Sequence, residues 1–395
     1  MKIRLQLHAW LAMACTVVLL GCASVPPGGV ASGPPPGLFD DAAFGVPAHR
    51  PDPSTVFALS PAMKQYLERD IAHLARKKGP QRALVEALYS KAQLHLEYDA
   101  ETTRTAAEAF EARTGNCLSL VVVTAALAKH LELPITYQTL VGHESWSRTG
   151  DLSFVNGHVN ILVAKRLIDR IEGYDADAQL RIDFGGLAGR GQGLRSIEES
   201  TILAMFFNNR AAEHLVRGQV DDAYAHAREA VRQDPRYASG YNTLGVIYQR
   251  RGLAGAAERA YAAALERDED HKSSLQNMAR LLERAGRAAE AASYSARLAR
   301  LERHPPFADF DRGVAAAKAG DFLHARELIL REMRRDPDYH EFHFWLAVAD
   351  HGLGDIESAK SHLGTALKNS LTRQDQALYA SKLRRLDPSA PVLRQ

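Results

Sequence analysis

The sequence predicts two folded regions, an α+β domain followed by an all-α helical solenoid. Within residues 60–195 the hydrophobic pattern changes from helical periodicity to strand-like alternation, and residues 204–371 repeat with a period of 34 residues. A Pro- and Gly-rich stretch precedes both regions. The chain has 395 residues, of which 46% are hydrophobic, and this suffices for two or three domains with cores of their own.

Residues 1–21 have the pattern of a secretory signal. The apolar stretch from Trp10 to Leu20 is shorter than the roughly 20 residues of a membrane-spanning helix. It ends in Leu19-Leu20-Gly21-Cys22, which resembles the lipobox of bacterial lipoproteins. The resemblance implies lipidation of Cys22 and, because Ala23 follows, an anchor on the periplasmic face of a Gram-negative outer membrane. An ordinary signal peptide with an incidental cysteine is the alternative.

Residues 22–59 are predicted to be a tether, because Pro and Gly dominate residues 23–55 without a helical or strand period. The net charge of +2 reflects 49 Lys and Arg against 47 Asp and Glu. Loss of Lys2 and Arg4 with the signal would bring the charge to zero. Since binding to phosphate backbones depends on positive charge, we expect no nucleic-acid partner.

Only one free thiol is expected in the mature chain. Cys15 is lost with the signal and Cys22 is lipidated, which leaves Cys117. Structural cysteines usually pair in an oxidising compartment, so a lone thiol is either buried or reactive. Asn116 is a good N-cap for a helix over 117–131, and the positive end of the helix dipole favours a thiolate at Cys117.

The other elements of residues 60–195 follow from caps and periods. Ser60-Pro61 starts a helix that reaches about Lys78, breaks at Gly79-Pro80 and resumes to about Glu97. Thr105 and Glu108 form a capping box at the start of a short helix. Alternating patterns predict strands over 135–141, 157–163 and 179–185.

A cysteine on a helix, then a histidine on a strand, then an aspartate on a strand suits a thiol nucleophile. The histidine moves the proton and the acid fixes the ring tautomer. The segments TAAEAFEARTGNCLSL, NGHVNILV and RIDFGG resemble the transglutaminase-like cysteine-hydrolase superfamily over roughly residues 60–195. The resemblance implies a papain-like α+β fold in which Cys117 is the nucleophile, His158 the general base and acid, and Asp183 the orienting acid.

Several alternatives stay open at this site. Asp175 and Asp177 are rivals for the acid, and His143 is a rival for the base. The backbone N–H of Cys117 is the expected oxyanion donor. The histidines lack metal-binding spacings such as H-E-x-x-H, and the Gly-rich stretch 185–195 is predicted to be a linker between domains. We therefore expect no metal and no cofactor.

The second half of the chain is predicted to be a repeat array. Glycine recurs at positions 218, 252, 286, 320 and 354, and alanine at 223, 257, 291, 325 and 359. The pattern resembles the tetratricopeptide repeat (TPR). We expect five units within 196–386, a capping helix over 372–386 and a tail over 387–395. The resemblance implies a surface for a protein or peptide partner, and the helix 196–215 should pack the catalytic domain onto the first repeat.

These patterns together predict a lipid-anchored thiol enzyme that acts on protein amide bonds, with its repeats recruiting the substrate or a partner. Attack by Cys117 gives an acyl-enzyme, which water resolves by hydrolysis or an amine by amide transfer. Proteolysis is the leading reaction. The alternative is a non-catalytic adaptor lipoprotein of the cell envelope, in which the enzyme-like region serves as a scaffold.

Overall fold

The computed structural model describes most of the chain beyond the predicted signal. The described residues are 33–100, 102–149, 152–169, 178–184, 193–301, 307–334, 336–370 and 373–386, without the side chains of 141–149 and 152–156. Cys22 and the predicted tail 387–395 lie outside the described residues. None of the helices in the described ranges is long and apolar enough to cross a membrane.

Short helices open the first region. After α1 (Pro53–Val56), the helix α2 (Pro61–Tyr66) continues through the π-turn η2 (Leu67–Ile71) into α3 (Ala72–Lys78). The hydroxyl of Ser60 accepts a hydrogen bond from the Met63 N–H at 3.2 Å, as expected of an N-cap. Gly79, with a φ of 81°, separates α3 from α4 (Pro80–Tyr89).

The helix α4 ends at Tyr89 and not near Glu97 as predicted. The chain turns back along α4, because the N–H groups of Leu94 and Leu96 donate to the carbonyls of Ala87 and Leu88 at 3.1 and 2.9 Å. The strand β1 (Glu97–Tyr98) then pairs in parallel with β2 (Thr114–Gly115). Between them, α5 (Ala106–Ala112) begins with the predicted capping box.

A four-stranded antiparallel sheet follows the helix α6 (Cys117–His130). Its order is β5-β4-β3-β6, and its strands are β3 (Ile135–Thr149), β4 (Leu152–Ala164), β5 (Gln179–Ile182) and β6 (Gly193–Ile197). The last residues of the predicted linker 185–195 therefore belong to a strand, since β6 pairs with β3 from Tyr137 to Val141. A 3₁₀ turn, η3 (Leu167–Asp169), follows β4.

The helix α6 lies at the centre of this first region. All of its residues from Leu118 to Ala128 are buried, and they join one hydrophobic cluster with Leu84 of α4 and Ile161 of β4. We call residues 53–197 the helix–sheet body. A papain-like domain is a finer assignment than these elements establish, and it stays a prediction.

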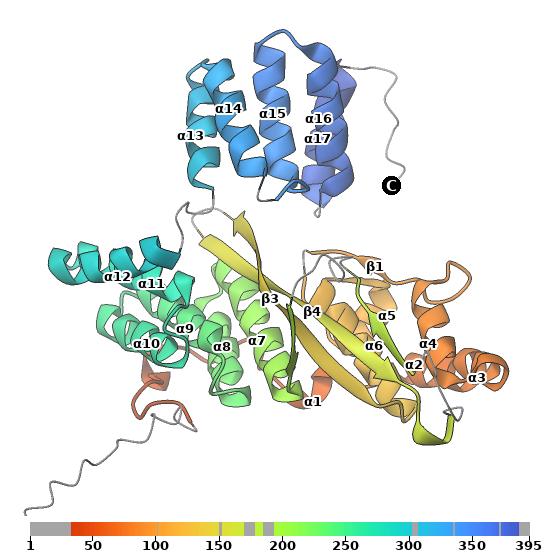
Figure 1. Ribbon diagram of the computed structural model, residues 1–395. Coiled ribbons are helices and arrows are strands. Elements are labelled where there is room, and N and C mark those ends of the chain that lie inside the picture. The colour runs from red at the N-terminus through yellow and green to blue at the C-terminus, as the bar shows by residue number, and fades with distance from the viewer. Residues whose placement is uncertain are drawn as a thin grey trace, which may run out of the picture.

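The repeat half consists of five helix pairs. They are α7 (Glu199–Val216) with α8 (Val220–Gln233), α9 (Ala238–Arg250) with α10 (Ala254–Arg267), α11 (Lys272–Arg284) with α12 (Ala288–Leu301), α13 (Ala308–Lys318) with α14 (Phe322–Met333), and α15 (His340–Gly352) with α16 (Ile356–Asn369). The helix α17 (Arg373–Leu386) packs against α16 as the predicted cap. In Figure 1, α7 to α12 form one stack and α13 to α17 another.

The repeated glycines and alanines have the roles that the period predicts. Each repeated glycine lies between the two helices of a pair with a φ between 74° and 84°, a conformation that glycine adopts without strain. Each repeated alanine is at most 1% exposed, where the paired helices approach closely. The array is therefore a TPR-type helical solenoid.

The helix α7 belongs to both halves of the molecule. Ile202, Phe206 and Phe207 join the core of the helix–sheet body, whereas Ala211 and Leu215 join the core of the first repeats. The predicted helix 196–215 thus does connect the two regions. It is also the first helix of the first repeat, so no linker separates the body from the array.

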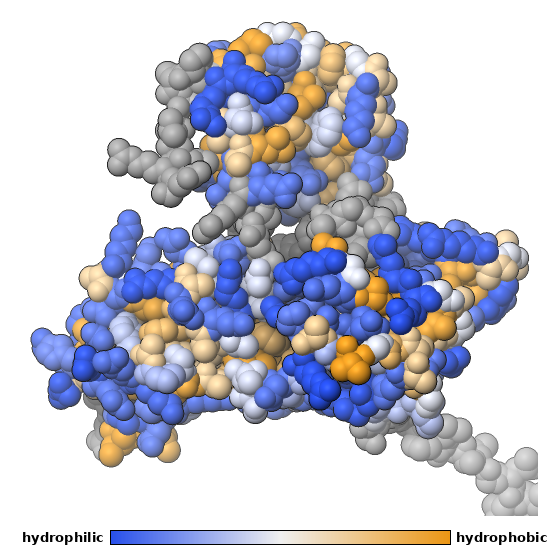
Figure 2. Space-filling model, turned by 180° about the vertical axis from the view of Figure 1, so that it is seen from behind, coloured by the Kyte–Doolittle hydropathy of each residue, from blue (hydrophilic) through white to orange (hydrophobic). Residues whose placement is uncertain are grey.

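The segment 33–50 differs from the predicted tether. It contains a 3₁₀ turn, η1 (Asp41–Ala43), and contacts the repeat helices, with Leu38 only 3% exposed. Its local composition has no period, but Asp40 and Asp41 find hydrogen-bond partners about 180 to 210 residues away in sequence, and Leu38 joins the hydrophobic core of the first repeats. We call residues 33–50 the N-terminal segment. The outer surface elsewhere is mixed, and on the face in Figure 2 hydrophobic residues occur in small patches among hydrophilic ones.

Candidate functional site

The cysteine at the start of α6 is held by a network of caps. The side-chain oxygen of Asn116 accepts hydrogen bonds from the N–H and the hydroxyl of Ser119, both at 2.9 Å. The Asn116 amide donates to the Thr103 hydroxyl at 2.8 Å. A Cβ on Gly115 would lie 2.6 Å from the Ser119 Cβ, so only glycine lets β2 approach the first turn of α6 this closely. The predicted N-cap is confirmed.

The structure brings two of the predicted triad residues into direct contact. His158 on β4 is 7% exposed, and its Nε2 lies 2.6 Å from the Oδ1 of Asp183, just after β5. The register of β4 and β5 pairs Ile161 with Ile182, so Asp183 continues the strand toward His158 on the same face. A buried imidazole with a carboxylate on one nitrogen has its tautomer fixed.

Cys117 lies at the edge of β4, beside the same histidine. The backbone N–H of Val159 donates to the Cys117 sulfur, and the charge of Asp183 is near enough to act on it. The N atom of Val159 belongs to the peptide bond between His158 and Val159. The Cys117 thiol therefore lies beside His158, the residue that carries the imidazole. Asp183 contacts the Nε2 of His158, so Nδ1 is the nitrogen of that imidazole that remains available for the thiol.

The charge state of the Cys117 thiol differs from the one that the sequence predicts. Burial raises the pKa of Cys117, although hydrogen bonds from the N–H groups of Val159 and Leu118 act in the opposite direction. The sequence predicts that the helix dipole and the unpaired N–H groups at the start of α6 favour a thiolate, whereas burial acts on the pKa of Cys117 in the opposite direction. A neutral thiol beside an oriented imidazole suits proton transfer to the histidine during attack, as in general-base catalysis.

The rival residues cannot be compared with these. Asp175 and Asp177 lie outside the described residues, and so does the side chain of His143. Two residues that sequence reasoning did not use share the face of His158. Asn160 is fully buried and Gln138 pairs with it across β3 and β4, yet both Asn160 amide atoms and the Gln138 Oε1 have no hydrogen-bond partner among the described residues. The alternation along β4, which places Asn160 on the same face as His158 two residues earlier, is the sequence signal that could have indicated Asn160.

The residues around the N-cap of α6 are also hydrogen-bonded to the repeat array. Glu213 on α7 accepts a hydrogen bond from the Thr103 N–H at 2.7 Å, and Arg210 donates to the Thr103 carbonyl at 3.3 Å. Thr103 in turn bonds to Asn116, so one residue joins α7 to the cap of Cys117. Sequence reasoning missed Thr103 because its partners on α7 are more than 100 residues away.

The N-terminal segment makes main-chain contacts with α8, α9 and α10. The hydroxyl of Tyr248 donates to the Leu38 carbonyl at 2.7 Å and accepts from the Asp40 N–H at 3.1 Å. Arg251 donates to the Ala43 carbonyl at 3.0 Å, and Arg267 donates to the Gly33 carbonyl at 3.1 Å. These contacts use main-chain groups of the segment and do not depend on the side chains at those positions.

An aromatic anchor and charges add side-chain contacts. The ring of Phe44 stacks on Tyr224 with centroids 3.9 Å apart, and the Arg251 guanidinium lies 5.4 Å from its centroid. Arg228 pairs with Asp41 at 3.1 Å. We call the set Tyr224, Arg228, Tyr248 and Arg251 the segment-binding surface.

Comparisons with known proteins bear on the repeats alone. No protein-family model matches the chain, and no curated protein matches it. Among solved structures, YrrB, described as a TPR protein with an unusual peptide-binding site, is 20% identical over 46% of this chain and 92% of its own, with a TM-score of 0.25. PilF of Pseudomonas aeruginosa is 17% identical over 49% of this chain and 96% of its own, with a TM-score of 0.28. MamA is 15% identical over 48% of this chain and 98% of its own, with a TM-score of 0.25.

Identities and TM-scores this low add nothing to what the repeats themselves show. The assignment depends on the 34-residue period, the five glycines with positive φ and the buried alanines. On those observations, the second half of the chain is a TPR-type array, an architecture that serves as a scaffold for protein interaction.

Proposed function

We propose that the repeat array binds an extended polypeptide segment on the segment-binding surface. The observation that carries this proposal is the N-terminal segment, which already occupies the surface with main-chain hydrogen bonds and one stacked phenylalanine. Arg228 and Arg251 favour a partner with acidic residues around an aromatic one. The partner is then a protein whose segment has the chemistry of residues 33–49 and competes with them.

The test uses a variant in which the contact between the N-terminal segment and the array is weakened. Phe44→Ala should loosen the N-terminal segment, and a synthetic peptide of residues 33–49 added in trans should then bind with a 1:1 stoichiometry by calorimetry. A further Tyr248→Phe change removes both hydrogen bonds of that hydroxyl and should weaken binding about tenfold. Tyr294→Phe on α12 is the matched control and should leave binding unchanged. Absence of binding in every variant would refute a peptide-binding surface.

As a second function, we propose that the helix–sheet body is a thiol enzyme that acts on protein amide bonds. The 2.6 Å contact of buried His158 with partly buried Asp183, beside Cys117, supports this proposal. A buried histidine–aspartate pair is costly to maintain away from water, and here it lies against the protein's one described free cysteine.

The chemistry uses three groups in sequence. The Cys117 sulfur would bond to the carbonyl carbon of the amide while its proton passes to His158 Nδ1. The amine would then leave with that proton, giving an acyl-enzyme. Water would release the acid by hydrolysis, or a second amine would form a new amide. Asp183 would stabilise the protonated imidazole, and the Cys117 N–H remains the expected oxyanion donor.

A generic acyl donor tests this without knowledge of the substrate. p-Nitrophenyl acetate should give a burst of nitrophenol equal to the enzyme concentration and an acetyl group on Cys117. Cys117→Ala and His158→Ala should each abolish the burst, and their combination should be no worse than either alone. Asp183→Asn should leave residual activity. A burst that survives Cys117→Ala would refute the enzyme assignment at this site.

The pH dependence of alkylation checks the charge of the thiol. Because burial raises the pKa of Cys117, the thiolate forms only at a pH above the ordinary range of about 8.5. Iodoacetamide labelling should therefore be slow at neutral pH and rise steeply above that range. A labelling midpoint well below it would instead indicate a thiolate–imidazolium pair in the resting protein.

We also propose that Cys22 carries a lipid and holds the protein at the outer membrane, facing the periplasm. The lipobox-like Leu19-Leu20-Gly21-Cys22 supports this. Cys22→Ser should release the protein into the soluble fraction without unfolding it, and continued fractionation with membranes would contradict the anchor. If the acyl donor gives no burst while the peptide of residues 33–49 binds, the protein is a non-catalytic adaptor.

A further inference from the structure

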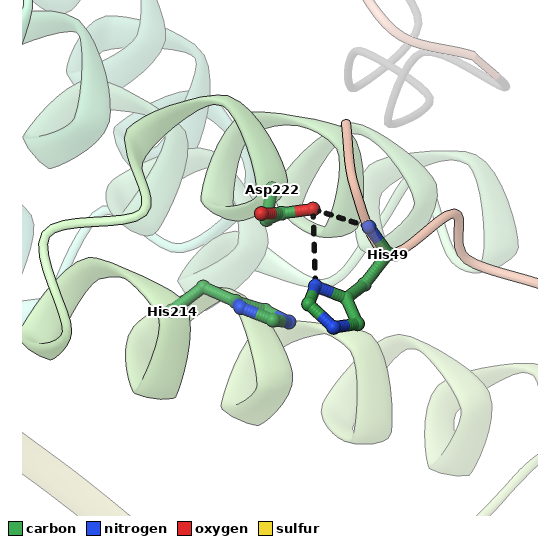
Figure 3. A group of neighbouring side chains, drawn as sticks. All are labelled: His49, His214 and Asp222. Carbon is green, nitrogen blue, oxygen red and sulfur yellow. Dashed lines mark hydrogen bonds and ion pairs between the residues drawn. The ribbon is translucent and has the colours of Figure 1, made fainter. Parts of the chain in front are cut away.

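A second group of ionisable side chains lies outside the Cys117 site. His49 ends the N-terminal segment, His214 lies on α7 and Asp222 on α8, and Figure 3 shows the three side chains converging. One ligand atom of each lies within 4.8 Å of the others. The Nδ1 of His49 is 3.5 Å from the Asp222 Oδ1, close to the ligand-to-ligand distance of about 3.4 Å around a tetrahedral zinc ion.

The buried nitrogen of His214 needs a partner. His214 is 2% exposed, and its Nε2 has no hydrogen-bond partner among the described residues. Its Nδ1 donates to the side-chain oxygen of Gln219 at 2.8 Å, so the lone pair of the neutral ring is on Nε2. In Figure 3 the ring extends toward His49, with ring centroids 5.4 Å apart. A buried acceptor left unpaired carries an uncompensated desolvation penalty, which a ligand at Nε2 would relieve.

The surrounding charges keep the ligands in their metal-binding forms. Burial lowers the pKa of His214, so its ring is neutral at pH 7. Burial raises the pKa of Asp222, but hydrogen bonds from the backbone N–H and the side chain of His49 act against burial, and the net direction of the pKa is downward. Arg210 opposes a cation electrostatically, but it is paired with Glu213 at 3.6 Å. His226 packs against His214 and donates its Nδ1 proton to the Asp222 carbonyl at 2.8 Å.

We propose that His49, His214 and Asp222 bind a divalent transition-metal ion of the zinc class. Two imidazoles and one carboxylate are the ligands that zinc prefers, and three protein ligands leave a fourth position for water. His49 is 57% exposed at the end of the segment, so it can adjust to the ion, whereas His214 and Asp222 are fixed on a helix pair. The ion would fasten the N-terminal segment to the first repeat.

This site could not be predicted from the sequence because its ligands have no regular spacing. His49 lies far before the helix pair, and His214 and Asp222 face one another across the turn at Gly218. Only the contact between the N-terminal segment and α8 brings the set together. The His49 N–H also donates to the Asp222 Oδ1 at 2.6 Å, so the backbone already fixes His49 beside the carboxylate.

The experiment titrates the full chain, freed of metal by chelation, with Co²⁺ and with Zn²⁺. Visible absorption of Co²⁺ should report one site with nitrogen and oxygen ligands, and calorimetry with Zn²⁺ should give one ion per chain. His49→Ala should weaken Zn²⁺ binding at least about tenfold without unfolding the chain, and His214→Gln should abolish it. His73→Ala, an exposed histidine of α3, is the matched control and should change nothing.

Hydrogen exchange provides a second readout. Zn²⁺ should slow amide exchange in residues 33–49 of the unmodified chain and have no effect there in His49→Ala. Weak, non-stoichiometric binding that is unaltered by His49→Ala would overturn the proposal. The contact of His49 with Asp222 would then be an ion pair and hydrogen bond alone.

Discussion

In the helix–sheet body a single hydrophobic cluster connects residues from α1 to α7, with α6 buried along nearly its whole length. In the array, buried residues form several smaller clusters, and each helix packs mainly on its neighbours in sequence. The body should therefore respond to damage as a unit, whereas damage in the array should stay local. The shared helix α7 is where these two behaviours meet.

The largest loss of stability is expected from a substitution in α7, the helix that the body and the array share. Phe207 is 2% exposed and packs edge-on against Phe206 at 5.4 Å. Phe207→Ala should lower the free energy of unfolding by about 3–5 kcal/mol because it leaves a cavity. Hydrogen exchange should speed up in both the body and the first helix pairs. A change confined to one of them would show that α7 does not couple the two.

A smaller loss is expected where the body holds its thiol. In Gly115→Ala the new Cβ would meet the Ser119 Cβ at 2.6 Å, so the first turn of α6 must shift. The cost should be about 1–3 kcal/mol, and exchange should speed up across the whole body. Gly364→Ala, in a helix with open space around it, is the control and should leave stability equal or slightly higher.

A glycine-to-alanine substitution in the array sharpens the comparison between the array and the body. Gly245 of α9 faces the ring of Tyr261, and a Cβ there would lie 2.4 Å from it. Gly245→Ala should also cost about 1–3 kcal/mol by overpacking. Here faster exchange should stay within α8 to α12, and alkylation of Cys117 should keep its rate. Equal loss of protection in the body would contradict nearest-neighbour behaviour in the array.

The smallest expected effect is a pH dependence of stability that comes from Glu213 on α7, where the body and the array meet. Burial raises the pKa of Glu213, so the folded chain binds its proton more tightly than the unfolded chain does. Stability should therefore fall as pH rises from about 4.3 through the higher pKa of the folded state, by about 1.4 kcal/mol per pKa unit. Glu213→Gln keeps an acceptor for Thr103 and should remove this part of the pH dependence. Unfolding curves from pH 4 to 8 measure it, and identical curves would exclude the effect.

Much of the fold follows from local signals in the sequence. The repeated glycines required positive φ and the alanines close helix contact, so period alone located all five pairs. The N-caps Ser60 and Asn116 and the capping box at Thr105 are equally local, and all three are confirmed. Of the site, the order of Cys117, His158 and Asp183 indicated neighbours that the structure does bring together.

The features that escaped prediction depend on distant contacts. The N-terminal segment has a tether's composition, and contacts with distant residues such as Tyr224 and Tyr248 give it a fixed place. The strand β6 begins within the Gly-rich stretch that the sequence predicts to be a linker, and pairing with β3 makes it a strand. The charge of Cys117 depends on burial by surrounding elements, which outweighs the helix terminus that the sequence indicates.

The place where the N-terminal segment first contacts the array sets how far the protein can extend. If Cys22 carries a lipid, the first described contact between the chain after Cys22 and the array is at Gly33, whose carbonyl accepts a hydrogen bond from Arg267, and not near Ser60. Those 11 residues span at most about 35–40 Å, against about 125–135 Å for the 38 residues up to Ser60. The first repeats, and not the thiol, would then be the part held nearest the membrane. Release of the segment from α8 would roughly triple the radius within which the protein can meet a partner.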